Sequence, residues 1–179
     1  RALWLTRKKC RSPRFSRRLA RRTPSKVRRP LRRQRQTNPP KLRLGLLGPD
    51  NEHETAAARQ AKEKKVSGAV LAYAEMMETE HGANQAKTQS LGTLADTDEV
   101  KAMKEKGQAE LATLGGKSGE DYEAAYIDAM VNGHTEALSL IDTRLLTLAS
   151  AGPVKQHLTE TRDAVARHLQ EAQELQAEK

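Results

Sequence analysis

The sequence has one cysteine, five aromatic residues and no apolar run of the length that a bilayer-spanning helix needs. A lone Cys10 excludes an internal disulfide framework and a zinc site built from cysteines. Because a spanning helix takes about 18 or more consecutive apolar residues, no transmembrane segment is predicted. Strands favour aromatic and β-branched residues, so the scarcity of both predicts an all-α protein.

The sequence signatures of several common active sites are also missing. It contains no G-x-x-x-x-G-K-[ST], no G-x-G-x-x-G and no G-x-S-x-G segment. Cys10 lies in a region without a predicted structured partner, so it is not expected to act as a nucleophile. These absences favour a binding or structural protein over an enzyme.

Acidic residues are absent from residues 1–43, which hold 18 of the 32 lysines and arginines and five of the seven prolines. This segment, the basic leader, is expected to be disordered because it repels itself and has no apolar periodicity. Three interpretations stay open: an arm that binds nucleic-acid phosphates, an Arg- and Ser-rich transit peptide, or a mis-framed upstream region, since the chain starts with Arg1.

Residues 44–179 hold all 23 acidic residues and show helical periodicity interrupted by turn signals. Asp50 or Asn51 is predicted to cap a first helix, Ser118 to cap the longest one, and Gly152 to precede the last. The pattern predicts an up-down helical bundle with four main helices and one short helix. The predicted ranges are about 51–66, 69–89, 119–149 and 153–176, with the short helix at about 98–114.

Three histidines lie on the apolar seams of three different predicted helices: His81, His134 and His168. Side chains on these seams point toward the bundle axis, so the imidazoles are expected to converge. The first helix offers Glu54 as an acidic partner. Imidazole and carboxylate groups bind transition metals, so these four residues form a candidate metal site.

Further candidate ligands lie one helical turn before the histidines. Glu78 precedes His81 in the Glu-x-x-His spacing that carboxylate-bridged metal bundles use, and Met77 and Met130 precede His81 and His134 by four residues. Soft sulfur beside imidazole favours copper, with iron as the alternative. A two-iron oxidase is disfavoured because Glu-x-x-His occurs once among the seam histidines.

A simpler interpretation stands beside the metal site: buried histidines and methionines are often ordinary core residues. His157 lies off the strict seam and is predicted to be a surface residue. Acidic residues of the second helix and beyond, among them Glu80, are predicted to form a solvated face.

Three segments resemble the bacterial domain-of-unknown-function family 4142 over roughly residues 44–177. They are AVLAYAEMMETEHGANQAK, DYEAAYIDAMVNGHTEALSLID and VKQHLTETRDAVARHLQEA. The resemblance implies a ferritin-like bundle, usually exported to the periplasm, with no settled biochemical activity. By position, the recurrent acidic and histidine residues of that family fall on Glu54, His81, His134 and His168.

The sequence therefore predicts a bacterial envelope protein with a transition-metal site and a role in metal handling or stress protection. Two alternatives remain: a structural or interaction bundle without metal, and a nucleic-acid-binding protein that uses the basic leader. A metal ion is the expected partner; nucleic acid is expected only if the leader belongs to the native protein, and the oligomeric state stays open.

Overall fold

The computed structural model describes residues 39–178, and the predictions for the rest of the basic leader lie outside this range. All regular structure within the range is helical, without a strand, so the predicted all-α class is confirmed. The helices are α1 (Pro39–Glu63), α2 (Gly68–Ser90), α3 (Asp98–Gly115), α4 (Gly119–Leu140), α5 (Leu146–Leu148) and α6 (Pro153–Ala177), and a π-helical turn, Ile141–Leu145, joins α4 to α5.

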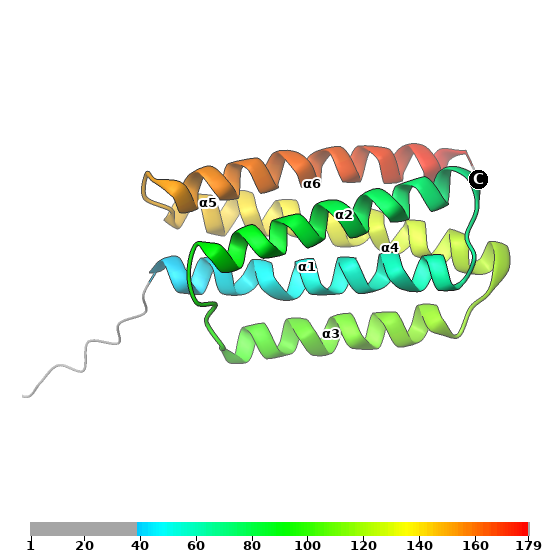
Figure 1. The fold of residues 1–179 in the computed structure, drawn as a ribbon, viewed down its shortest axis with the longest axis horizontal. Helices are drawn as coiled ribbons and strands as arrows, with labels where there is room; N and C mark the ends of the chain where they lie inside the picture. Colours follow the sequence, from blue (N-terminus) through cyan, green and yellow to red (C-terminus); the bar gives the residue numbers. More distant parts are fainter. Residues whose placement is uncertain (1–38, 179) are drawn as a thin grey trace, which may run out of the picture. The chain divides into compact units, whose positions relative to one another are not determined.

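Four long helices, α1, α2, α4 and α6, run side by side as a bundle, and α3 lies against α1 (Figure 1). The most extensive contacts are between α1 and α2 and between α4 and α6. This arrangement is consistent with the ferritin-like bundle that the sequence predicted. None of the described helices combines the length and apolar character needed to cross a bilayer.

Three of the predicted helices agree with α2, α3 and α6 to within two residues at each end. The hydroxyl of Thr97 accepts a hydrogen bond from the Val100 amide and caps α3. Ser118 occupies the N-cap of α4 but its side chain makes no capping hydrogen bond, so the predicted capping box is wrong.

The predicted start of the first helix near residue 51 is wrong, because α1 begins at Pro39 and runs through Pro49. A proline inside a helix costs about 3 kcal/mol. Three leucines ahead of it, Leu44, Leu46 and Leu47, are buried. Burial of each leucine contributes about 1.5–3 kcal/mol, so their packing outweighs the cost of the proline and the helix continues.

The predicted helix over 119–149 is one continuous helical segment, but it contains the π-helical turn that the sequence did not reveal. Its i→i+5 hydrogen bonds widen the turn and rotate the faces of the residues that follow. Ile141 and Leu145 are buried, whereas Leu148, three residues after Leu145, is 54% exposed.

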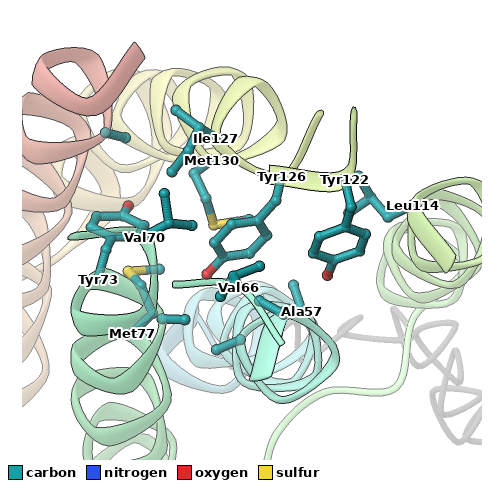
Figure 2. Packing of buried hydrophobic residues seen from close by; sticks show 14 residues of the cluster. Ala57, Val66, Val70, Tyr73, Met77, Leu114, Tyr122, Tyr126, Ile127 and Met130 are labelled. Carbon is teal, nitrogen blue, oxygen red and sulfur yellow. The ribbon is translucent and has the colours of Figure 1, made fainter. Parts of the chain in front are cut away.

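The buried side chains form two apolar clusters. The first surrounds Tyr73, Tyr122 and Tyr126, which occupy the space that Trp and Phe fill in many cores (Figure 2). The second lies around Ile141 and Leu158. Along α1, α4 and α6, buried polar residues lie between positions of one cluster and positions of the other. Together with His81 of α2, these residues are called the polar layer: Asn51, Glu54, His81, His134 and His168.

The close contact between Gly45 and Ala95 allows a first test of this fold. A Cβ there would lie 2.9 Å from the carbonyl oxygen of Ala95, which is backbone and cannot rotate away. We expect Gly45→Ala to lower the free energy of unfolding by about 1–3 kcal/mol in chemical denaturation.

Gly82 in α2 is the matched control, since a Cβ there meets nothing within 4 Å. Gly82→Ala is expected to stabilise the protein by about 0.5–1 kcal/mol through helix propensity. Equal effects of the two substitutions would contradict the contact between α1 and the segment that follows α2.

Candidate metal centre

Three imidazoles from three helices meet inside the bundle. His81 of α2, His134 of α4 and His168 of α6 are each no more than 4% exposed. Their ring centroids are 5.7 Å apart for His81 and His134, 5.2 Å for His81 and His168, and 5.5 Å for His134 and His168. We call these three residues the histidine triad.

One nitrogen of each triad ring is held from outside by a hydrogen-bond acceptor. Nδ1 of His81 donates to Oδ1 of Asn51 (2.9 Å), and Nδ1 of His134 donates to the carbonyl oxygen of Met130 (2.8 Å). Nε2 of His168 donates to Oε2 of Glu80 (2.9 Å). Since an acceptor requires a proton on the nitrogen that faces it, these contacts fix the tautomer of each neutral ring.

The opposite nitrogen of each ring has a lone pair and no partner. Nε2 of His81, Nε2 of His134 and Nδ1 of His168 are buried without a hydrogen bond among the described residues. Native structures leave few buried polar atoms unsatisfied, so three in one layer require an explanation. A metal ion bound by the three lone pairs would satisfy all of them.

The spacing of the triad suits a single ion. One ligand atom from each histidine lies within 4.8 Å of the others, so a common point is at most about 2.8 Å (4.8/√3) from all three. Metal–imidazole bonds are about 2.0–2.1 Å long. The rings therefore need to draw in by less than about 1 Å, which is within the range of small side-chain rotations.

A chain of amides and a hydroxyl orients His81. Nδ2 of Asn51 donates to the carbonyl oxygen of Leu47 (3.0 Å) and to Oδ1 of Asn84 (2.9 Å). Asn84 in turn donates to the hydroxyl of Thr161 (2.7 Å). Because the Leu47 carbonyl can only accept, the amide group of Asn51 cannot flip, and its oxygen must face His81.

Glu80 has the corresponding role for His168, and this corrects the prediction that it lies on a solvated face. Its Oε2 accepts from Nε2 of His168 and, at 3.1 Å, from Arg167. Burial raises the pKa of Glu80, but the hydrogen bond from His168 and the charge of Arg167 outweigh it, so the net shift is downward. Carboxylate–histidine pairs of this kind orient metal ligands in many proteins.

Burial keeps His81 and His134 neutral at neutral pH. Burial lowers the pKa of His134 to about 4, although its hydrogen bond to the Met130 carbonyl acts in the opposite direction. Burial, followed by the neighbouring His134 and His168, also lowers the pKa of His81 well below its usual value. Neutral imidazole is the form that binds metal, so His81 and His134 hold their lone pairs at neutral pH.

Glu54, the predicted carboxylate ligand, lies beside the triad but not among its three converging atoms. Its Oε1 is 3.8 Å from Nδ1 of His134, the nitrogen that is already bonded to Met130, and its Oε2 has no partner in the described part of the chain. Burial, and then the nearby Asp50 and Glu110, raise the pKa of Glu54 well above its usual value.

The remaining predicted ligands, Glu78, Met77 and Met130, make other contacts. The two carboxylate oxygens of Glu78 accept from Arg59 (2.8 Å) and Lys62 (2.5 Å), between α1 and α2. Met77 and Met130 are fully buried in the tyrosine-containing cluster, where Figure 2 shows both among aromatic rings.

The prediction that His157 lies on the surface is wrong. His157 is 3% exposed, and its Nε2 forms a 2.8 Å hydrogen bond with the hydroxyl of Thr88. Its position is one residue before Leu158, so it shares part of the buried face of α6. A seam defined by apolar residues alone could not reveal a histidine that is buried against a threonine of another helix.

A small pocket of about 30 Å³ opens beside the triad between α2 and α6. His81, His168, Asn84 and Glu80 contribute to its lining. Its volume is about that of one water molecule. A solvent molecule therefore fits next to two of the three histidines.

The protein is therefore an all-α bundle with an internal histidine centre. Its helices bury three imidazoles, and the outer nitrogen of each imidazole is held by a hydrogen bond. The chain belongs to the family described as domain of unknown function (DUF4142), which matches residues 41–175. The resemblance noted from the sequence is thereby confirmed. Comparison with curated proteins and with solved structures gives no match.

The buried triad predicts a loss of stability in acid for the metal-free protein. An unfolded histidine is protonated below about pH 6.5, whereas folded His134 is protonated only below about pH 4. Between these values the unfolded state binds more protons, so the free energy of unfolding falls as the pH falls. His134 alone accounts for a loss on the order of 3 kcal/mol over this window.

Denaturant unfolding from neutral pH to about pH 4, with a chelator present, measures this loss. His134→Gln keeps a polar side chain without the titration, so its slope should be shallower by up to about 1.4 kcal/mol per pH unit. Asn132→Gln, at an exposed neighbour on α4, should retain the original slope. An unchanged slope in His134→Gln would show that this ring is not held neutral.

Proposed function

We propose that the protein binds one transition-metal ion through His81, His134 and His168. The observation that carries the proposal is the set of three buried, unpartnered ring nitrogens, each on a ring whose other nitrogen is anchored. An ordinary packed histidine is expected to have both nitrogens satisfied or one exposed to water. Anchoring of the outer nitrogens is the arrangement that metal-bound histidines use.

The surroundings of the triad suit a site with three protein ligands and an open position. The small pocket beside His81 and His168 has room for one solvent molecule, and a solvent ligand would complete such a site. Glu54 lies on the Nδ1 side of His134, so we assign it to the outer shell, where its carboxylate would offset the charge of the ion. Direct ligation by Glu54, as the sequence predicted, requires its side chain to turn toward the three lone pairs.

Nitrogen-only ligation favours copper, which binds such ligands most strongly among the divalent first-row metals. Iron is the second candidate. This preference for copper does not require a sulfur ligand; Met77 and Met130 both pack in the apolar core.

Metal handling or stress protection in the bacterial envelope is the role that we propose for this ion, with the periplasm as the location. Support for both comes from the family resemblance, and the fold by itself does not specify an activity. The ferritin-like architecture is compatible with this role because such bundles build metal sites from inward-facing side chains of different helices.

Titration of the full chain with Cu²⁺, with Fe²⁺ and Zn²⁺ for comparison, tests the proposal. We expect one ion per chain and a rise in melting temperature, because binding to the folded state stabilises it. His134→Ala should weaken binding by at least about 100-fold, since it removes a ligand. The measurement is isothermal calorimetry on untagged protein that carries Cys10→Ser, so that the leader thiol cannot bind copper.

The matched control is His157→Gln, which alters a buried histidine of the same bundle that bonds to Thr88 and lies outside the triad. It should leave the affinity unchanged. Absence of stoichiometric binding, or equal binding by wild type and His134→Ala, would assign the three histidines to packing alone.

The anchoring of His81 gives a separate prediction. Asn51→Leu removes the acceptor of its Nδ1 proton and should weaken metal binding by about 10–100-fold. Asn51→Asp keeps an acceptor oxygen and should retain more of the affinity. Competition with a chromophoric chelator ranks the three proteins; a greater loss in Asn51→Asp than in Asn51→Leu would contradict the orienting role.

A further inference from the structure

A larger cavity, of about 270 Å³, lies between α1, α3 and α4, on a different side of Glu54 from the small pocket. Its size exceeds the roughly 30 Å³ of a water molecule several-fold and approaches that of small-molecule sites. None of the three triad histidines lines it. It is therefore a distinct place at which a ligand could bind.

The walls of this cavity are strongly acidic, but most of the charge is already paired. Of the carboxylates that line it, Glu99 forms an ion pair with Arg144, Glu110 lies 3.3 Å from Nε2 of His53, and Glu136 pairs with Lys106. These pairs account for the carboxylates contributed by α3 and α4.

The two remaining carboxyl groups, Asp50 and Glu54, belong to α1 and lie one helical turn apart on the same face. Neither forms an ion pair with a lysine or arginine in residues 44–178. Glu54 is 2% exposed, and its Oε2 has no hydrogen-bond partner there. A buried carboxyl group with an unpartnered oxygen calls for a cationic or hydrogen-bond-donating partner.

Two glycines keep space open around this acidic wall. A Cβ at Gly133 would lie 3.2 Å from Oε1 of Glu54, and a Cβ at Gly107 would lie 2.9 Å from Nδ1 of His53. Any other residue at either position would compete with the polar groups for the same space. Gly107 and Gly133 both line the cavity.

Apart from Lys106 and His53, which pair with Glu136 and Glu110, the rest of the lining is apolar and selects the kind of cation. Met103, Ala137 and Leu140 contribute hydrocarbon surface to the cavity. Among the described residues, the triad is the one group of three ligands close enough to share a bare metal ion, so the carboxyl groups of this cavity do not form such a set. An organic cation does not need such a set, and its hydrocarbon part covers the apolar wall as well.

We infer that this cavity binds a small aliphatic amine in its ammonium form. The ammonium group would lie at Asp50 and Glu54, donating up to three hydrogen bonds, and the alkyl chain would lie against Met103, Ala137 and Leu140. The inference uses a different cavity from that of the histidine triad, although Glu54 lies beside both.

Binding of n-butylammonium to the full chain, measured by isothermal calorimetry in the presence of a chelator, tests the inference. n-Butanol has the same alkyl chain without the charge, and butyrate has the opposite charge. We expect butylammonium to bind at least about tenfold more tightly than either, a difference that corresponds to one charge-assisted contact. This comparison uses wild-type protein and does not depend on the folding of any variant.

Variants then locate the site. Asp50→Asn should weaken butylammonium binding by about tenfold, and Ala137→Leu should weaken it by filling the cavity. Glu63→Gln, at an exposed position of the same helix, should have no effect.

Three results would overturn the inference: no binding of butylammonium, equal binding of n-butanol, or binding unchanged by Asp50→Asn. Displacement of the amine by Mg²⁺ in the wild type but not in Asp50→Asn would also overturn it, because the site would then bind an inorganic cation.

Discussion

The polar layer of the bundle depends on one constraint: each triad imidazole is held by its outer nitrogen, and its inner nitrogen has no hydrogen-bond partner among residues 39–178. An unsatisfied buried polar atom costs about 1–3 kcal/mol. Three of them together represent a large part of the 5–15 kcal/mol by which a domain of this size is stable. The arrangement is therefore costly for an empty bundle, and this cost supports a role for the triad in binding.

The apolar clusters on either side of the layer hold the rings in place. On α4, Met130 belongs to the tyrosine-containing cluster and Ile141 to the other, with His134 between them. On α6, Val165 and Ala172 flank His168 in the same way, in the opposite order along the chain. Since the helices are fixed on both sides of the histidines, a sliding of one helix would disrupt two clusters. Ligand atoms held on packed helices in this manner are preorganised.

The part of the site that follows from helical periodicity was predictable from the sequence. The three-and-four spacing of apolar residues placed His81, His134 and His168 on inner faces, and the structure brings them together. The same periodicity located α2, α3 and α6. Spacing reports which face of a helix a residue occupies, and this was sufficient for residues near the bundle axis.

Contacts between helices were not predictable, because periodicity carries no information about which residue of a neighbouring helix lies opposite. Glu80 is on the edge of α2 and becomes a partner of His168 only when α6 lies beside it. His157 is buried by Thr88 for the same reason. The early start of α1 depends on packing that outweighs the effect of Pro49. The π-helical turn depends on a local change of helical pitch. The pattern of a single sequence shows neither of these effects.

Glu54 connects the two parts of the interior that the bundle leaves polar. Its Oε1 is 3.8 Å from His134, and the same residue lines the larger cavity. The position of its side chain is limited by Gly133, whose missing Cβ would lie 3.2 Å from that oxygen. A side chain at position 133 would therefore have to displace Glu54, altering both the surroundings of His134 and the wall of the cavity. The absence of a side chain at Gly133 thus leaves room for the buried carboxyl group of Glu54 beside both His134 and the acidic cavity.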